Sequence, residues 1–161
     1  MPVIVKFIVS NEENAHKVSQ IAKQHFKKVV KDIDIDKEYS VFNFLDKANS
    51  FTREWLMSFD VTGEDEDRQE EPRSFAELVS AHIPTEINGS KPLFVEKTIP
   101  STDEGTNKVI NRVLEIAAQR RHDIVWAEVP AADTTIIKAY EDAGFKENGR
   151  RNNALLFTKE I

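Results

Sequence analysis

Residues 133–145 read DTTIIKAYEDAGF, and this stretch decides the fold of the chain. Asp133 precedes the first apolar residue by three positions, where a carboxylate caps a helix by accepting from its first turn. Gly144 follows the last apolar residue, where a left-handed residue commonly ends a helix. The stretch therefore predicts a short amphipathic helix. Its inner face is expected to consist of Ile136, Ile137, Tyr140 and Ala143.

Strands are predicted on both sides of this helix. Ile124–Val129 begins with an unbroken apolar run, which is typical of a strand covered on both faces of a sheet. Another strand is expected from Phe145 onward, followed by a turn at Asn152-Asn153. A last strand is expected over Ala154–Thr158.

A second helix is predicted upstream, between two strands. Leu93–Ile99 is a strand closed by Pro100, and residues 103–106 form a loop that enters a long helix. Because a strand–helix–strand crossover is right-handed and joins parallel strands, Leu93–Ile99 and Ile124–Val129 should be parallel neighbours. The buried stripe of this helix is expected to be Val109, Ile110, Val113, Leu114 and Ala117.

The first half of the chain gives a weaker pattern. Val3–Val9 predicts a buried strand, and Ser10 or Asn11 can cap a helix that continues to Val30. His25 lies on the apolar face of that helix, where a packed, hydrogen-bonded histidine is the expected role. The apolar positions of this helix are Val18, Ile21, Ala22, His25, Phe26, Val29 and Val30.

The segments that follow were interpreted as a hairpin and a short helix. Val41–Leu45 and Trp55–Val61 predict two antiparallel strands joined by a turn over Asp46–Ser50. A short helix ending before Pro84 and a turn at Asn88-Gly89 are expected next. The apolar side of that helix would contain Phe75, Leu78, Val79 and His82.

The predicted order of elements is β-α-β-β-(short α)-β-α-β-α-β-β, which is an α/β fold with a central mixed sheet flanked by helices. We expect one domain over residues 1–161, because no linker or repeat interrupts the pattern. Residues 62–73 are expected to be an acidic loop insertion. Its acidic side chains at residues 64–71 either stay solvated or contact a basic partner or a cationic amine.

Composition limits the classes of function. The chain has 161 residues, no cysteine and a net charge of −6 with a pI near 5.3. Cysteine nucleophiles and thiolate metal sites are excluded, and the acidic net charge argues against a nucleic-acid partner, because phosphates favour basic surfaces. The opening MPVIVKFIVSNEEN is too short and too charged in its apolar run for a signal peptide, and no apolar stretch is long enough to span a membrane. We therefore expect a cytoplasmic protein.

Residues 92–161 resemble the second half of the GNAT (GCN5-related N-acetyltransferase) superfamily. The family stretch that reads N-x-x-A-I-x-L-Y-E-x-x-G-F is similar to residues 133–145, with Asp133 in place of the Asn and Ile136 in place of the small residue. FKENGRR and the closing LLFTKEI are also similar to family endings, whereas the first 90 residues match in topology only. The positions that match in register are Ile137, Tyr140, Glu141, Gly144 and Phe145.

The resemblance implies an acyl-CoA N-acyltransferase fold, with acetyl-CoA as cofactor. In this family the tyrosine lies near the sulfur of coenzyme A, so Tyr140 is implied as the general acid that protonates the leaving thiolate. The alternative is that Tyr140 is a core aromatic residue with a hydrated hydroxyl. The residues implied to hold the cofactor are Ile99, Gly105, Thr106, Asn107, Lys108 and Asp133.

The cofactor loop departs from the family pattern. GNAT proteins bind pyrophosphate with a loop like Q/R-x-x-G-x-G/A, whereas residues 100–108 read PSTDEGTNK and keep Gly105 alone. Asp103 and Glu104 place negative charge where phosphates would lie, which opposes an anion. The loop is therefore either a degenerate phosphate site or an ordinary helix start, where acidic residues are favourable.

Two carboxylates are candidates for a general base acting through water, Glu96 and Glu128, and each is otherwise an edge or surface charge. A backbone N–H of the strand Leu93–Ile99 would polarise the thioester carbonyl. No metal spacing joins the histidines, and we expect no metal. Two hypotheses remain: acetyl transfer to a primary amine of a small molecule or peptide, or a non-catalytic binding or regulatory protein that has lost the cofactor site.

Overall fold

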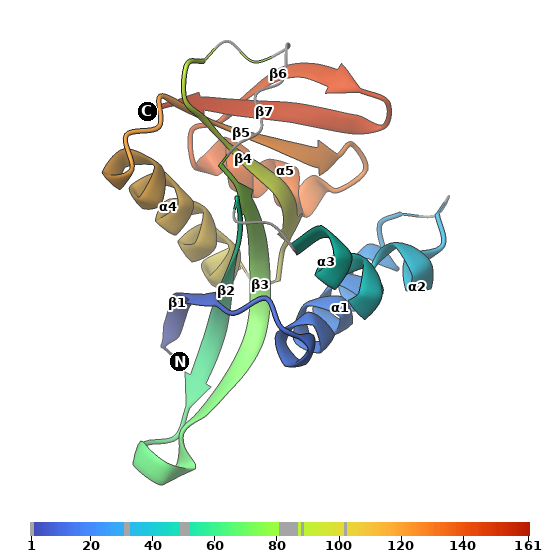
Figure 1. Ribbon diagram of the computed structural model, residues 1–161, viewed down its shortest axis with the longest axis vertical. Coiled ribbons are helices and arrows are strands. Elements are labelled where there is room, and N and C mark those ends of the chain that lie inside the picture. The colour runs from blue at the N-terminus through green and yellow to red at the C-terminus, as the bar shows by residue number, and fades with distance from the viewer. Residues whose placement is uncertain (1, 31–32, 49–51, 81–86, 88, 102) are drawn as a thin grey trace.

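The computed structural model describes residues 2–30, 33–48, 52–80, 87, 89–101 and 103–161 (Figure 1). Seven strands form one sheet, and helices lie on both of its faces. The elements in chain order are β1 (Val3–Ile8), α1 (Glu12–Phe26), α2 (Ile35–Glu38), α3 (Val41–Ala48), β2 (Arg53–Thr62), η1 (Asp65–Asp67), β3 (Gln69–Val79), β4 (Pro92–Ile99), α4 (Asp103–Gln119), β5 (Ile124–Pro130), α5 (Thr134–Asp142), β6 (Lys146–Arg151) and β7 (Ala154–Glu160).

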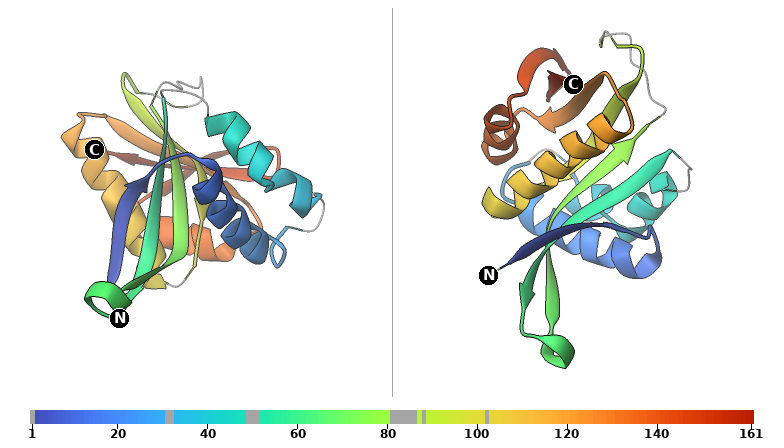
Figure 2. Two further views of the ribbon diagram at one scale, coloured as in Figure 1. Left: turned by 60° about the horizontal axis from the view of Figure 1, so that its bottom comes forward. Right: turned by 90° about the vertical axis from the view of Figure 1, so that its left-hand side faces the viewer.

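The sheet has the order β1-β2-β3-β4-β5-β7-β6. Every neighbouring pair is antiparallel except β4 and β5, which are parallel, as the sequence predicted for Leu93–Ile99 and Ile124–Val129. Helix α4 covers one face of the sheet, and α1 to α3 cover the opposite face (Figure 2). Within the core, Val113 and Trp126 are buried, and Leu114 and Ile137 are partly buried. The chain is thus a mixed α/β fold.

The prediction of a strand at Val41–Leu45 was wrong, because this segment is helix α3. Phe44 and Ala48 are buried while Val41 and Leu45 pack beside them, so the apolar side chains follow the helical spacing of three and four. The hydroxyl of Ser40 accepts from the backbone N–H of Asn43 at 3.1 Å and caps the helix start. The predicted hairpin therefore does not exist, and β2 pairs with β1 and β3 instead.

The predicted helix around Phe75 was also wrong. Residues 74–79 belong to β3 and are all buried, because helices cover both faces of the sheet there. Continuous burial removes the alternation by which a strand is recognised. His82, Pro84 and Asn88 lie outside the described residues. The acidic insertion is shorter than residues 62–73, since β2 runs to Thr62 and β3 starts at Gln69.

One irregularity of the sheet creates the site. In the pairing of β3 with β4, Glu77 faces Lys97 and Leu78 faces Val95, so Glu96 is the extra residue of a β-bulge. The pairing of β4 with β5 ends at the same level, with Val95 facing Ala127. Beyond that pair β4 stays bonded to β3 and β5 stays bonded to β7, so the two parallel strands separate at the centre of the sheet.

Phe75 tests the revised packing of α3. Its ring is fully buried and lies edge-on to Trp55 and Phe44, at centroid distances of 5.7 and 6.2 Å. Phe75→Ala should lower the free energy of unfolding by about 3–5 kcal/mol, the range for a buried phenylalanine. Phe42→Ala is the matched control on α3, since that ring is 76% exposed, and should change it by no more than about 0.5 kcal/mol. Urea denaturation measures both values, and equal effects would contradict this packing.

Candidate functional site

A cavity of about 630 Å³ lies where β4 and β5 separate. Residues 96–98 of β4 and residues 128–130 of β5 line it, and side chains of α1 and α2 lie against it. Both candidate bases from the sequence, Glu96 and Glu128, are therefore brought together at one cavity. The sequence alone did not determine which face of β4 Glu96 occupies, because the bulge interrupts the alternation of side chains.

The two carboxylates have different surroundings. Arg53 on β2 pairs through one guanidinium nitrogen with Glu96 and, at 3.2 Å, with the buried carboxylate of Glu77. Glu77 also accepts from the indole N–H of Trp55 at 3.0 Å. Glu128 pairs more loosely, with its Oε2 3.8 Å from Arg151 Nη1. Glu96 is thus held in a charged network with Arg53 and the buried Glu77, whereas Glu128 is the less constrained of the two carboxylates.

Lys97 is a site residue that the sequence analysis did not identify. Its side chain lines the same cavity, and its Nζ lies over the rings of Tyr39 and Phe44, at 5.1 and 4.9 Å from their centroids. Burial, assisted by the nearby charge of Lys47, lowers the pKa of Lys97 to about 8. The signal in the sequence was a lysine inside the apolar run LFVEKTI.

Tyr140 lies beneath the cavity wall. Its hydroxyl is 2.6 Å from that of Thr98, which does line the cavity, and its ring packs against Phe145 and Phe157. Burial raises the pKa of Tyr140 well above its usual range, and the hydrogen bond with Thr98 opposes that shift. Tyr140 therefore stays protonated and reaches the cavity through Thr98.

The start of α4 places the predicted cofactor residues in different surroundings. Gly105 is buried, and a side chain there would come within 3.1 Å of the Ser58 hydroxyl, so the glycine permits close packing of α4 on the sheet. Lys108 turns to β1, where its Nζ donates to the carbonyl of Val3 at 3.2 Å. Its ammonium also lies 3.3 Å from the Glu104 carboxylate. The side chain of Ile99 is buried in the core.

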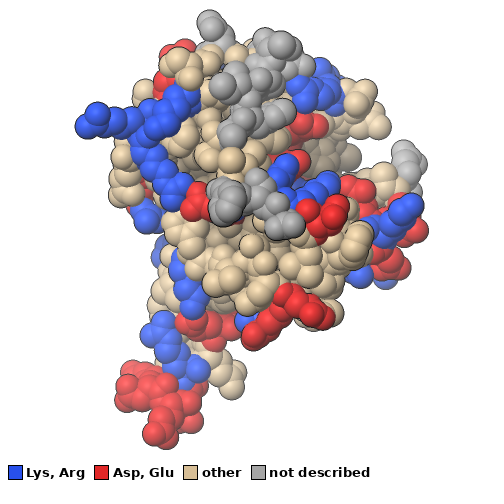
Figure 3. Space-filling model, in the orientation of Figure 1, with Lys and Arg blue, Asp and Glu red and all other residues tan. Residues whose placement is uncertain are grey.

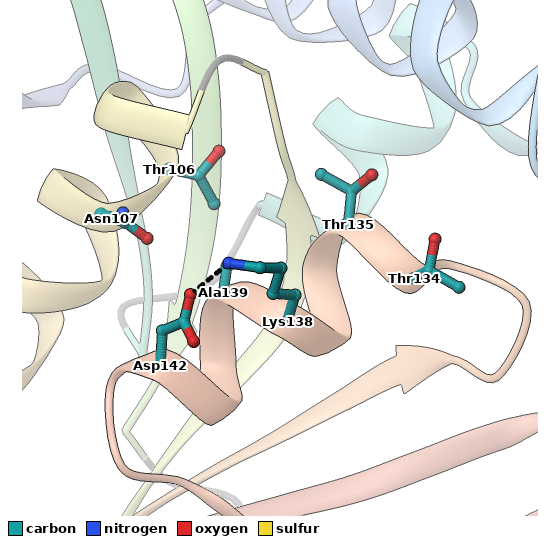
Figure 4. Close-up of a pocket in the computed structure, with 7 residues that line it drawn as sticks. All are labelled: Thr106, Asn107, Thr134, Thr135, Lys138, Ala139 and Asp142. Atoms are coloured by element: carbon teal, nitrogen blue, oxygen red, sulfur yellow. Dashed lines mark hydrogen bonds and ion pairs between the residues drawn. The ribbon is translucent and has the colours of Figure 1, made fainter.

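Thr106 and Asn107 instead face a second cavity, of about 300 Å³, between α4 and α5 (Figure 4). The Thr106 hydroxyl accepts from the backbone N–H of Ser101 at 3.0 Å, which fixes the turn into α4. On the α5 side the ammonium of Lys138 pairs with Asp142 at 2.8 Å. The residues around this cavity are Thr106, Asn107, Thr134, Thr135, Lys138, Ala139 and Asp142.

In the sequence, Asp133 follows residues that line the first cavity and precedes residues that line the second, but it lines neither cavity itself. Its carboxylate is 1% exposed, accepts from the backbone N–H of Ile136 at 3.2 Å and lies 2.6 Å from Nε2 of His25. One carboxylate therefore provides both the expected cap of α5 and the expected hydrogen-bond partner of His25. Asp133 joins the end of α1 to the start of α5.

The acidic residues 64–67 form the tip of the β2–β3 hairpin, which projects from the body of the molecule (Figure 3). None of these residues lines either cavity. Among the described residues, no group of histidine, aspartate and glutamate side chains is placed to hold a metal ion. No helix in the described ranges is long and apolar enough to cross a membrane.

Several solved structures with this architecture are described as acetyltransferases. PaiA N-acetyltransferase of Thermoplasma acidophilum, solved with coenzyme A, has a TM-score of 0.73 at 13% identity, covering 100% of both chains. Aminoglycoside 6'-acetyltransferase type Ii has a TM-score of 0.65 at 14% identity, covering 98% of this chain and 96% of its own. The ribosomal-protein-S18-alanine N-acetyltransferase of Escherichia coli has a TM-score of 0.64 at 13% identity, covering 99% of this chain and 94% of its own.

No protein-family model matches the sequence, and no curated protein matches it either. The likeness is therefore one of fold. The chain has the GNAT acyl-CoA N-acyltransferase fold, with its seven-stranded mixed sheet and flanking helices, as the sequence resemblance implied.

Asp133 gives a direct test of the link between α1 and α5. Asp133→Ala removes both the cap and the partner of His25, whereas Asp133→Asn retains an oxygen for the Ile136 N–H. The alanine variant should therefore lose about 1 kcal/mol more unfolding free energy than the asparagine variant, the usual value of a cap. Urea denaturation of both variants measures the difference, and identical losses would rule out the capping role.

Proposed function

We propose that the protein is an acyl-CoA-dependent N-acetyltransferase that acts on a primary amine. The observation that carries this proposal is the separation of β4 from β5 at the Glu96 bulge, with a cavity of about 630 Å³ at the opening. A gap between parallel strands leaves residues 96–99 of β4 without a strand partner on the β5 side, where a backbone N–H could polarise a thioester carbonyl. PaiA, solved with coenzyme A, has the same fold.

We further propose that the cavity between α4 and α5 takes the phosphates of the cofactor. The hydroxyls of Thr106 and Thr135, the amide of Asn107 and the ammonium of Lys138 lie around it, and the Asp142 carboxylate that pairs with Lys138 lies there too. A helix N-terminus adds backbone N–H groups that favour anions. The unfavourable charge of Glu104 is partly offset by Lys108 on the next turn. When bound, acetyl-CoA would supply the acyl group; Ile99, Gly105 and Asp133 would support this site through the backbone and packing.

Glu128 is proposed as the general base of the acceptor cavity. Its loose contact with Arg151 leaves carboxylate oxygens that can take a proton from the amine through water. Glu96, which pairs with Arg53, is proposed to contribute to the negative charge that attracts the cationic form of the acceptor. The acceptor is therefore expected to be a cationic small-molecule or peptide amine.

Tyr140 is proposed to supply the proton for the leaving thiolate. Burial keeps that proton on the phenol, and the 2.6 Å contact with Thr98 brings it to the cavity wall. The Thr98 hydroxyl would give its proton to the thiolate and accept the proton of Tyr140, and the phenolate would regain a proton from solvent by the same route once the thiol leaves. Tyr140 would then act as the acid of the reaction without contacting the acceptor.

The alternative is a binding or regulatory protein with the same fold. The contact between His25 and Asp133 favours it, because this hydrogen bond holds buried the residue that stands at the family's asparagine position. Release of thiol from acetyl-CoA in the presence of amines separates the two functions. The enzyme must release it, and the binding protein must not.

Binding of coenzyme A should raise the melting temperature, because a ligand that binds only the folded state stabilises it. Lys138→Glu reverses the charge beside the α4–α5 cavity and should reduce that rise, with a smaller difference at high salt. Lys146→Glu on β6 is the control, since this exposed lysine lines neither cavity. A thermal scan with coenzyme A gives the answer, and an equal rise in both variants would place the phosphates elsewhere.

Removing either proton-transfer group should reduce kcat for thiol release by about 100-fold or more, the usual contribution of a general acid or base. The variants are Glu128→Gln and Tyr140→Phe, each of which removes the proton-transfer function and keeps the shape of the side chain. Glu160→Gln, at the exposed end of β7, is the control and should keep wild-type kcat. A fully active Tyr140→Phe variant would reject Tyr140 as the acid, and absence of thiol release by the wild type with any amine would reject the enzyme.

A further inference from the structure

Lys97 places a primary amine of the protein itself inside the acceptor cavity. Its Nζ lies over the rings of Tyr39 and Phe44, and it follows the bulge residue Glu96 directly in β4. In the part of the chain that the structure describes, no carboxylate forms an ion pair with this ammonium. Among the described residues, the faces of Tyr39 and Phe44 lie against this amine, at the point where β4 leaves β5.

The charged groups around Lys97 come from every element packed against it. Burial is the largest influence on the pKa of Lys97, which is lowered to about 8; Lys47 and Arg53 act in the same direction, whereas Glu38 and Glu77 oppose the shift. A larger fraction of this amine is therefore neutral near pH 8 than of an exposed lysine, whose pKa is about 10.4. These groups are Glu38 at the end of α2, Lys47 on α3, Arg53 on β2, Glu77 on β3, Glu96 on β4, Glu128 on β5 and Arg151 on β6, and the titratable hydroxyl of Tyr39 follows α2.

We propose that Lys97 is a self-acylation site, at which the protein transfers an acyl group from acetyl-CoA to its own Nζ. This inference rests on the proposed function, because it requires the thioester to lie at the opening between β4 and β5. Lys97 meets the conditions for an acceptor by geometry: it is a primary amine, it lines the cavity and it adjoins the bulge. Proximity alone accelerates such a reaction, since the amine need not be captured from solution.

The reaction is balanced without a further reactant. The neutral Nζ attacks the acyl carbonyl carbon, a C–N bond forms and the C–S bond breaks. The nitrogen loses one proton to Glu128 through water, and the thiolate gains one from the Tyr140–Thr98 pair. Glu128 then releases its proton to solvent and Tyr140 regains one, so the net products are acetylated Lys97 and the free thiol. The modified side chain is neutral. Acetylation would therefore remove the positive charge of Lys97 from the cavity, while the carboxylates of Glu96 and Glu128 remain.

Competitive labelling tests the site directly. The purified protein is incubated with acetyl-CoA between pH 6 and 9.5, and acetylation is followed by peptide mass spectrometry, with exposed Lys146 as the internal reference. Lys97 should acetylate at least about tenfold faster than Lys146, since its amine is positioned and partly neutral. Its rate should rise with pH and level off above about 8, and free coenzyme A should suppress it.

Acetic anhydride, which needs no cofactor site, gives a second readout: its reaction with Lys97 should show the same pH midpoint, near 8. Lys97→Arg is the control for intact mass and should lose the fast adduct. Lys97 acetylation by acetyl-CoA that is no faster than that of Lys146, or that free coenzyme A does not suppress, overturns the inference. If coenzyme A raises the melting temperature and Lys97 still stays unmodified, self-acylation fails alone; if coenzyme A neither raises it nor suppresses labelling, the proposed function fails with it.

Discussion

The rest of the site depends on one constraint, the extra residue that Glu96 adds to β4. A bulge bends its strand and increases the local twist, so β4 can stay bonded to β3 while it leaves β5. Because β5 stays paired with β7 over its whole length, the sheet opens in its middle only beyond the Val95–Ala127 pair. Two cavities lie near this opening, one against α1 and α2 and the other between α4 and α5.

Charge at the opening is arranged around the same residue. Arg53 connects Glu96 to the buried Glu77, and removing one partner of such a buried network usually costs far more than the network contributes. The network by itself is therefore weak evidence for stability. The two carboxylates of the cavity also differ in their pairing: Glu96 is paired closely with Arg53, whereas Glu128 has only a looser contact with Arg151. Between them Lys97 is held over aromatic rings, so the cavity combines negative charge with an amine of lowered pKa.

The C-terminal half of the fold could be predicted from the sequence because its signals agree with one another. Leu93–Ile99 and Ile124–Val129 are apolar runs joined by an amphipathic helix, and the Asp133 cap and the Gly144 stop mark α5. The strand prediction for Val41–Leu45 failed because a run of five residues with two phenylalanines is compatible with a strand as well as with the helix that tertiary packing selects. The helix prediction around Phe75 failed because this part of β3 is buried on both faces, so its apolar and polar residues do not alternate.

The candidate site was predictable only in part. Glu96, Glu128 and the Tyr140 position follow from the resemblance to GNAT proteins, but a bulge cannot be read from single residues, and the ion pair of Glu96 with Arg53 joins residues 43 positions apart. Hydrogen–deuterium exchange with and without coenzyme A tests the central claim most directly, because ligand contact slows local opening. The account predicts protection confined to residues 97–107 and 134–140, the segments at the β4–β5 opening and the α4–α5 cavity. No protection there, or protection at the hairpin tip of residues 63–68 instead, would contradict it.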